Sequence, residues 1–459
     1  MGNAAVPVGE TGSAPSRAYR APVRGRGPLS AQTSYHPVGR ALADLGPRTE
    51  RPSTVTVDTS APEPALPVPD VPGGVADQTG LPQRAALTWG QRAVVDASAL
   101  ADLGLRTAIA SLVGAAMLPP MMTTALQRNQ SRTEQDNLRF YADLAAQGDP
   151  AVSFPAPTEL PRVVSRLANP FAERIAGGNV DNIAFPSSFV PRNPTMRPLW
   201  QTLSRNNVVR AQHWRHDDGA RPTLCVIHGF MGSPYLFNGL FFSLPWFYRC
   251  GYDVLLFTLP FHGRRAEKYS PFSGYGLFSH GMAGFAEAMA QAVHDFRSVI
   301  DHLRHTGVDR IALTGMSLGG YTSALIASVD DRLDAVIPNV PVVSVQDEVD
   351  DWFPANKLFS LGRRLGRIDH EQFAAATAFH SPLTYRPLVP KDRRLIITGL
   401  GDRLAPPEQS EMLWEHWDRC ALHWFPGNHI LHVSQPTYLR RTNRFLRPFM
   451  FDHAGETPA

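Results

Sequence analysis

The sequence predicts an α/β protein with a mostly parallel sheet that is covered by helices on both faces. From about residue 206 onwards, short apolar runs alternate with helical patterns, as expected when parallel strands are joined by helices. The runs TLCVIHG (223–229) and DVLLFTLP (253–260) lack polar alternation, which is typical of strands buried on both faces. The chain has 459 residues, of which 43% are hydrophobic, so it can bury a large core.

The composition and the N-terminal sequence bear on which partners and which cellular location we expect. A formal net charge of +3 gives no general reason to expect a nucleic acid, and three cysteines are too few for a disulfide framework. The N-terminus MGNAAVPVGE lacks the basic and apolar regions of a secretory signal, so the sequence predicts a cytoplasmic protein. The longest apolar run, 107–122, is interrupted by Pro119–Pro120 and is shorter than the roughly 20 residues of a spanning helix, so we expect a buried or surface-lying helix.

Two N-terminal segments are predicted before the α/β region. Residues 1–85 are rich in proline and are expected to form a disordered tail, because they cannot bury enough apolar surface to offset the entropy of ordering. The arginines of this tail leave open a peripheral contact with an anionic membrane surface, although a solvated tail is the ordinary alternative. Residues 86–205 are predicted to form a helical and irregular extension, with one helix ending at Pro119–Pro120, a second opening at SRTE (131–134) and a short helix at 161–167.

The third segment, 206–450, carries the alternating pattern of a single α/β domain. Its strands are short and apolar, and its helices show spacing of three to four residues between apolar positions. Strands are predicted at 208–214, 223–229, 253–260, 310–315, 334–340, 393–400 and 421–425, and helices at 284–307, 318–329, 407–418 and 434–447.

The segment TGMSLGG (314–320) places Ser317 between Gly315 and Gly319, where a predicted buried strand meets a predicted helix. A tight turn in this setting holds a serine in a strained conformation and projects its hydroxyl above the end of the strand. Bulky side chains two residues before and after the serine would clash in such a turn, which explains the glycines. A glycine-rich turn that merely contains a hydroxyl is the alternative; the position between strand and helix favours a nucleophile.

On these residues the sequence resembles the α/β-hydrolase superfamily, in particular its serine esterases and lipases. The resemblance covers about 206–448 and does not extend to the N-terminal region. It implies an oxyanion hole made by the N–H after the nucleophile, which belongs to Leu318, and by an N–H from the loop after an earlier strand. TLCVIHGFMGSP supplies such a loop, in which Phe230 is the expected donor and Met231 the alternative. A plain strand-to-helix loop is the ordinary interpretation of the same residues.

The resemblance also implies that an acid and then a histidine follow the serine along the chain. Asp402 follows the strand RRLIITGL and precedes the helix that opens at Pro406–Pro407. His429 lies in the sequence PGNH after the last strand, 27 residues beyond Asp402. Five competing residues lie near these strands: Asp347, Asp350 and Asp351 for the acid, and His423 and His432 for the histidine.

The activity implied by this resemblance is cleavage of a carboxylic ester of a small molecule or lipid, or of a thioester, through an acyl-enzyme on Ser317. No metal or organic cofactor is implied. Two alternatives stay open: an acyltransferase that passes the same acyl group to an alcohol, and a hydrolase-like domain that binds without catalysis. The sequence does not predict an oligomeric state.

Some fifty residues separate the strands at 334–340 and 393–400, which is too long for a simple connection. Similar enzymes carry a helical lid here, so a lid is expected over about 343–390. Trp352 and Phe353, together with Met231, are the expected apolar contacts of a substrate. The loop LPFHGRRAEKYS adds Arg264, Arg265 and Lys268, which leave open a contact with an anionic head group.

Overall fold

The computed structural model describes residues 75–76, 80–82, 86–126, 128–232, 235–352, 356–357, 360, 364, 369–430, 432 and 435–451. All of them belong to one compact unit, Val68–Ala459. The tail expected over residues 1–85 therefore lies almost entirely outside the described residues.

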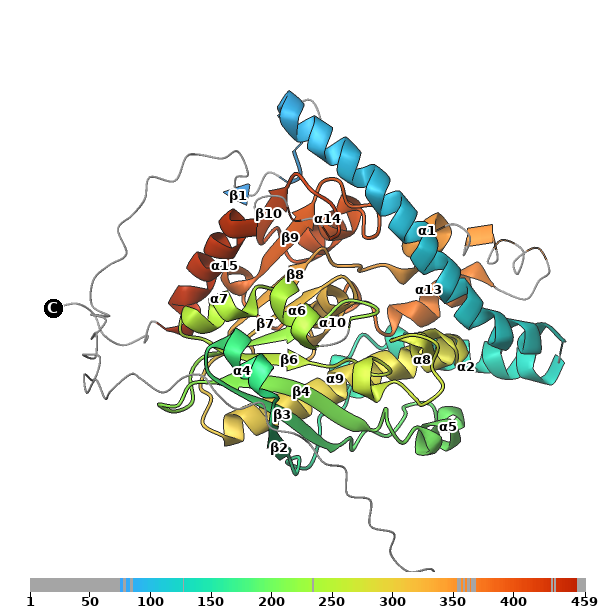
Figure 1. Ribbon diagram of the computed structural model, residues 1–459. Coiled ribbons are helices and arrows are strands. Elements are labelled where there is room, and N and C mark those ends of the chain that lie inside the picture. Colours follow the sequence, from blue (N-terminus) through green and yellow to red (C-terminus); the bar gives the residue numbers. More distant parts are fainter. Residues whose placement is uncertain are drawn as a thin grey trace, which may run out of the picture. The chain divides into compact units, whose positions relative to one another are not determined.

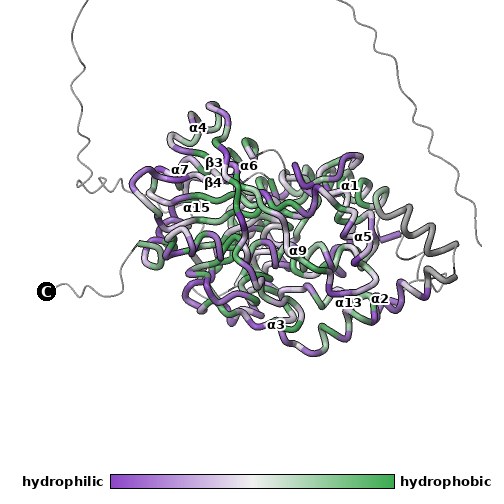
Figure 2. The backbone as a smooth tube through the Cα atoms, turned by 90° about the horizontal axis from the view of Figure 1, so that it is seen from below, coloured by the Kyte–Doolittle hydropathy of each residue, from purple (hydrophilic) through white to green (hydrophobic). Residues whose placement is uncertain are grey.

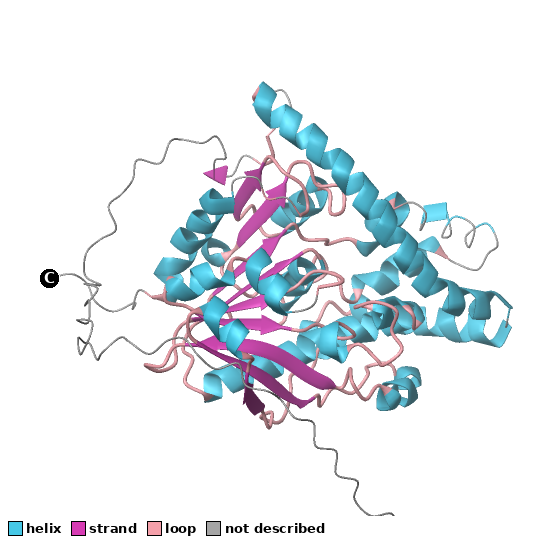
Figure 3. Cartoon of the chain, in the orientation of Figure 1, coloured by secondary structure: helices cyan, strands magenta, loops and turns pink. Residues whose placement is uncertain are grey.

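The described strands form a ten-stranded sheet in the order β1-β10-β9-β8-β7-β5-β6-β4-β3-β2. Neighbouring strands from β10 through β9, β8, β7 and β5 to β6 are parallel, and the pairs at both edges are antiparallel. Figure 3 shows these strands flanked by helices. The strands are β1 Val75–Ala76, β2 Val164–Leu167, β3 Asn179–Pro186, β4 Val208–Arg215, β5 Thr223–Ile227, β6 Asp253–Phe257, β7 Ile311–Met316, β8 Ala335–Asn339, β9 Leu395–Gly399 and β10 Ala421–Phe425.

Helices cover both faces of the sheet, and β5 shows why its sequence is apolar throughout. Cys225 and Ile227 contact the hydrophobic cluster beneath α9 (Gly281–His305), α10 (Leu318–Ile326) and α14 (Pro407–His416). Leu224 and Val226 contact the cluster on the opposite face, beneath α7 (Leu244–Arg249) and α15 (Gln435–Met450). Because successive side chains of a strand point to opposite faces, burial on both sides requires a continuous apolar run. The predicted α/β fold with a mostly parallel sheet is confirmed.

The N-terminal extension is built into this sheet. It contributes α2 (Arg128–Ala146), α3 (Pro150–Ser153), α4 (Pro170–Ala176), α5 (Arg197–Thr202), a 3₁₀ turn at Pro194–Met196 and the edge strands β2 and β3. The helix expected over 161–167 is wrong, because Val164–Leu167 pairs with β3 and satisfies its backbone groups as a strand. β3 in turn pairs along its whole length with β4.

The first helix, α1 (Trp89–Leu126), is longer than expected, since it continues through Pro119–Pro120. Over Trp89–Ala116 it is the one described helix long and apolar enough to cross a membrane by length and composition alone. One of its faces is buried, however, through Val95, Ala99, Asp102 and Ala110. This spacing of three to four residues packs α1 lengthwise against the domain.

Between β8 and β9 the structure contains α11 (Val345–Asp351) and α13 (His370–Ala378), within the range expected for a lid. α13 lies beside α2 of the extension (Figure 1, Figure 2). The Gln372 Nε2 donates to the Gln135 carbonyl at 2.9 Å. The rings of Tyr141 and Phe379 lie 5.2 Å apart. The extension and the segment before β9 are thus packed together.

Candidate active site

Ser317 lies in a strained turn between β7 and α10, with φ 56° and ψ −117°. Positive φ is uncommon for a residue with a side chain and is held only where the surroundings enforce it. The flanking glycines have a steric cause. A Cβ on Gly315 would lie 2.3 Å from the Gly319 carbonyl oxygen, and a Cβ on Gly319 would lie 2.1 Å from the Ile227 carbonyl oxygen. Only glycine permits the end of β7, the start of α10 and the end of β5 to approach so closely.

The loop after β5 lies directly beside this serine. A Cβ on Gly229 would lie 3.5 Å from the Cβ of Ser317. Among the described residues, no acceptor takes the N–H of Phe230 or of Leu318, the first residue of α10. The ring of Phe230 points into a cluster with Phe272, Phe278 and His262. The two N–H groups expected to form an oxyanion hole thus have no acceptor in the described part of the chain.

Asp402 and His429 are brought together from loops after β9 and β10. His429 Nδ1 lies 2.7 Å from Asp402 Oδ2, and the two side chains are 2% and 0% exposed. The other carboxylate oxygen, Oδ1, accepts the N–H groups of Leu404 and Ala405, both at 2.8 Å. Every oxygen of this buried carboxylate is thus hydrogen-bonded, which fixes its orientation toward the imidazole.

The pKa of His429 is raised above its ordinary value. Burial opposes this by disfavouring the imidazolium, but the charge of Asp402 and its hydrogen bond outweigh burial, with a further contribution from the charge of Asp102. A histidine in this setting is a stronger base than a free imidazole. It suits the removal of a proton from a hydroxyl.

Ser317 is not hydrogen-bonded to the Asp402–His429 pair. Its Oγ makes none with any described residue, so its relation to His429 rests on their positions at the carboxyl ends of β7 and β10. Such contacts are often long before a substrate is bound. The three assigned roles stay predictions.

The competing residues have other surroundings. Burial lowers the pKa of His423 to about 4; this residue lies within β10, with Nδ1 3.1 Å from Arg441 Nη1. Burial also lowers the pKa of His432 to about 4, and its ring packs between Phe425, Phe241 and Tyr438. The three competing acids all have exposed side chains on α11: Asp347, Asp350 and Asp351.

A carboxylate that the sequence analysis missed lies against this site. Asp102 of α1 is 1% exposed, and its Oδ2 accepts the N–H of His429 at 3.0 Å and the N–H of Arg403 at 3.1 Å. The sequence feature that could have revealed Asp102 is its helical spacing from the buried apolar residues of α1, three residues after Ala99. A carboxylate on the apolar face of a helix is rarely buried without a partner.

A second missed carboxyl lies on α11. Glu348 is 8% exposed, and neither of its oxygens has a well-aligned hydrogen bond to a described residue, although the nearby Trp352 side chain favours its charged form. Burial raises the pKa of Glu348 well above its ordinary value, and the charges of Asp402 and Asp351 raise it further. The sequence placed acids on this segment but gave no sign of which one faces inward.

The expected substrate contacts are only partly described. Met231 is 37% exposed and has φ 62°, and Trp352, at the end of α11, is half-buried. Phe353 lies outside the described residues. The expectation for Arg265 is wrong, because this side chain is fully buried and pairs with Asp295 at 2.6 Å. Arg264 is exposed.

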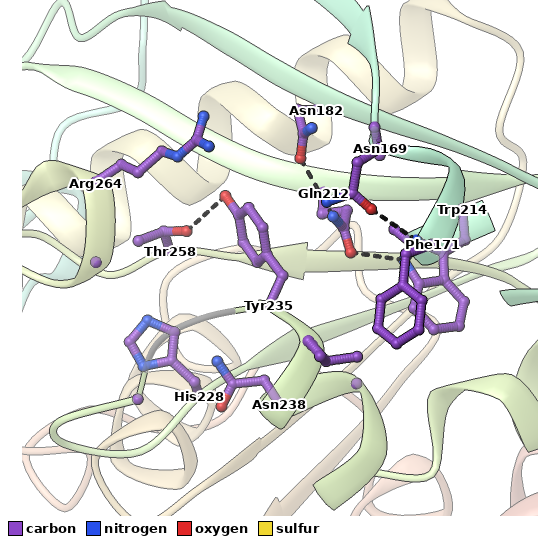
Figure 4. A pocket seen from close by; sticks show the side chains of 16 residues that line it. Asn169, Phe171, Asn182, Gln212, Trp214, His228, Tyr235, Asn238, Thr258 and Arg264 are labelled. Carbon is purple, nitrogen blue, oxygen red and sulfur yellow. Dashed lines mark hydrogen bonds between the residues drawn. The ribbon is translucent and has the colours of Figure 1, made fainter. Parts of the chain in front are cut away.

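A cavity of about 230 Å³ adjoins the loop that carries Phe230 (Figure 4). His228 and Gly232 line it from that loop, while Ser317, Asp402 and His429 do not. In Figure 4 the Tyr235 hydroxyl points toward Thr258, at 2.9 Å, and Gln212 lies between Asn182 and Trp214. The cavity is therefore polar on one side. Within the described ranges, no group of three or more His, Cys, Asp or Glu residues is arranged to hold a metal ion.

Comparison with known proteins agrees with this architecture. Residues 222–365 match a family model described as the alpha/beta hydrolase fold. An uncharacterized protein of Mycobacterium tuberculosis (strain CDC 1551 / Oshkosh) is 30% identical over 307 residues, which are 64% of this chain and 68% of that protein. A second, from strain ATCC 25618 / H37Rv, is 32% identical over 262 residues, which are 54% of this chain and 59% of that protein. The chain belongs to the α/β-hydrolase superfamily.

Among solved structures, an acetyl xylan esterase from Paenibacillus sp. R4 is 15% identical, with a TM-score of 0.47 over 67% of this chain and 94% of that one. Acetyl xylan esterase 1 from Thermoanaerobacterium sp. JW/SL YS485 is 14% identical, with a TM-score of 0.47 over 66% of this chain and 92% of that one. Neither likeness bears on the substrate of this chain.

Proposed function

We propose that the protein is a serine hydrolase that cleaves a carboxylic ester through an acyl-enzyme on Ser317. The observation that carries the proposal is the strained serine at the end of β7, on the same sheet edge as a buried Asp402–His429 pair at 2.7 Å. Strain of this kind persists at functional sites, and a histidine held by a buried carboxylate is the base that such a serine needs.

In this mechanism His429 takes the proton from Ser317 as the hydroxyl attacks the ester carbonyl, and then delivers it to the leaving alcohol. Asp402 holds the imidazole and stabilises its charged form without accepting the proton. The N–H groups of Phe230 and Leu318 stabilise the oxyanion, and losing one such donor typically costs about 3–4 kcal/mol of transition-state stabilisation. Water then releases the acyl group by the same route.

The surroundings favour an ester with an apolar part. Exposed apolar side chains come directly after two of the proposed site residues in the chain. Met231 follows Phe230, and Ile430, which is 41% exposed, follows His429. α6 (Tyr235–Phe241) adds Phe237, which is 72% exposed. Apolar surface beside a nucleophile binds apolar substrates by removing that surface from water.

A fluorophosphonate probe tests the proposal directly, because it labels only an activated serine. We expect labelling of the intact protein, and we expect Ser317→Ala to abolish it while the thermal unfolding curve stays unchanged. Turnover of p-nitrophenyl esters of increasing chain length should fall by roughly 10⁴-fold or more in this variant. Ser328→Ala is a matched control, since Ser328 is a buried serine just after α10 whose hydroxyl donates to the Ala324 carbonyl.

The outcomes separate the alternatives. Products formed with an added alcohol in preference to water would indicate an acyltransferase. Absence of labelling in folded protein would contradict catalysis by Ser317 and favour a binding domain.

A further inference from the structure

One carboxylate oxygen joins two loops of the site that are far apart in the chain. Asp102 Oδ2 accepts the N–H of His429 and the N–H of Arg403, the residue after Asp402. The same atom therefore holds the backbone of His429 and the backbone just after Asp402, in addition to the bond between the Asp402 and His429 side chains. A single acceptor shared by two loops fixes the distance between them.

Other contacts of α1 fall on the same two loops. The Ser98 carbonyl accepts the Asn428 side-chain N–H at 3.0 Å, and the Arg106 Nη1 donates to the Arg403 carbonyl at 3.3 Å. A Cβ on Gly401 would lie 2.9 Å from the Val95 carbonyl oxygen. The backbone of α1 thus closely approaches the loop that carries Asp402, here called the acid loop. α1 then continues along the loop that carries His429, here called the histidine loop.

The second oxygen of Asp102, Oδ1, is buried and accepts no hydrogen bond from any described residue. If the role of this side chain were only to link the two N–H groups, a neutral acceptor would serve as well. A carboxylate is less favourable there, because its second oxygen is buried without a hydrogen bond. The charges that act on Asp102 are those of Asp402 and His429, and Arg403 contributes its backbone N–H. A negative charge at Asp102 acts on this set, and most strongly on the residue it bonds.

We infer that Asp102 is a positioning residue of the catalytic site: its charged carboxylate, delivered by α1, ties the acid and histidine loops together and stabilises the imidazolium of His429. The inference rests on the proposed function for its catalytic meaning. In this arrangement α1 belongs to the active site, because its Asp102 adds a second negative charge near His429, besides that of Asp402.

The electrostatics support this assignment. Burial raises the pKa of Asp102, whereas the two N–H donors oppose that shift by favouring the charged form. The charge of Asp102 is one of the causes that raise the pKa of His429. Since a histidine with a raised pKa stays protonated to higher pH, removing the charge should move its titration to lower pH.

The test compares Asp102→Asn, which keeps an acceptor oxygen but loses the charge, with Asp102→Ala, which loses both. Titration of His429 by NMR of histidine-labelled full-length protein, assigned with His429→Gln, measures the charge effect without any need for turnover. We expect the pKa of His429 to fall by about half a unit to one unit in Asp102→Asn. Asp96→Asn, an exposed carboxylate on the same helix, is the control and should leave it unchanged.

Ester turnover gives the second readout. We expect the acidic limb of kcat/KM against pH to move to lower pH in Asp102→Asn, with kcat down about tenfold and KM nearly constant. Asp102→Ala should lose roughly a further tenfold. A pKa of His429 in Asp102→Asn equal to that of the wild type, in a protein with the same melting temperature, would overturn the inference. Failure of the proposed function is recognised separately, as absence of fluorophosphonate labelling while the pKa of His429 still shifts.

Discussion

Two buried carboxyls near His429 differ in how their oxygens are satisfied. Asp402 uses both oxygens, one on His429 and one on the N–H groups of Leu404 and Ala405. Neither oxygen of Glu348 has a well-aligned hydrogen bond to a described residue, and the nearby Trp352 side chain offsets burial only in part, although Glu348 is nearly as buried. A carboxyl in that condition avoids its charged form by holding its proton.

The protonation of Glu348 should make the stability of the protein depend on pH. Burial raises the pKa of Glu348 well above the ordinary 4.5. The folded protein therefore binds this proton more tightly than the unfolded chain does, and the free energy of unfolding should fall as pH rises from about 4.5 toward the raised pKa. Glu348→Gln has no such proton. We expect the free energy of unfolding of the variant, relative to wild type, to increase by up to about 1.4 kcal/mol for each pH unit across this window.

Denaturant unfolding at a series of pH values measures this difference. The exposed Glu371 on the neighbouring helix α13 supplies the control, Glu371→Gln, which should follow the wild type at every pH. Parallel pH curves for Glu348→Gln and the wild type would contradict the prediction. They would mean that Glu348 is ionised in the folded protein.

At the scale of elements, the contact between α1 and the acid loop depends on Gly401. A Cβ at this position would lie 2.8 Å from the Gly427 carbonyl oxygen and 2.9 Å from the Val95 carbonyl oxygen. Both neighbours are backbone atoms that cannot rotate away. The close approach of helix and loop is therefore open only to a residue without a side chain.

We predict that Gly401→Ala destabilises the protein by about 1–3 kcal/mol, because the new methyl group separates α1 from the acid loop. The adjacent Asp402 should be displaced with it, so labelling by fluorophosphonate should slow more than the loss of stability explains. Denaturant unfolding and labelling rates measure the two effects.

Gly104→Ala provides the matched control on α1 itself. No atom lies within 4 Å of a Cβ at Gly104, and this glycine sits in the interior of the helix. Alanine there should stabilise by about 0.5–1 kcal/mol through its higher helix propensity. Equal effects of the two substitutions would show that Gly401 is not a site of close contact.

At the scale of the molecule, the N-terminal extension and the hydrolase-like segment share one sheet and one core. β3 pairs with β4, and β1 pairs with β10 at the opposite edge. The hydroxyl of Tyr385, a residue before β9, is hydrogen-bonded to the Ser153 hydroxyl of α3 at 2.9 Å. Strand pairing and side-chain contacts of this kind are typical of one domain rather than of two domains joined by a linker.

Truncation tests this unity. Deleting residues 1–67, which lie outside the unit Val68–Ala459, should leave the melting temperature and the labelling of Ser317 unchanged. Deleting residues 1–126 removes α1 with Asp102 and uncovers the loops that carry Asp402 and His429, so we expect labelling to be lost. A protein without residues 1–126 that is labelled at the wild-type rate would contradict the integration of α1 into the site.

Much of the central sheet was predictable from the sequence, because each of its strands carries its own signal. A strand buried on both faces must be apolar at every position, and β5, β6 and β7 are recognisable for that reason. The turn at Ser317 was predictable from its glycines, since a Cβ on Gly315 would clash with the Gly319 carbonyl four residues further on; the clash at Gly319, with the Ile227 carbonyl of β5, is a tertiary contact. β2 was not, because Val164–Leu167 is an exposed edge strand whose only specification is its pairing with β3.

The sequence by itself thus determined the α/β class and indicated the tight turn at Ser317, because these depend mainly on residues close together in the chain, whereas Asp402 and His429 were named through the resemblance to a family. Only the tertiary structure decided which charges meet: that Arg265 is buried on Asp295, that Glu348 rather than its acidic neighbours faces inward, and that Asp102 bonds the backbone of His429 across 327 positions. Side chains carry no local mark of a partner hundreds of residues away, since that partner is chosen by the packing of whole helices against the sheet.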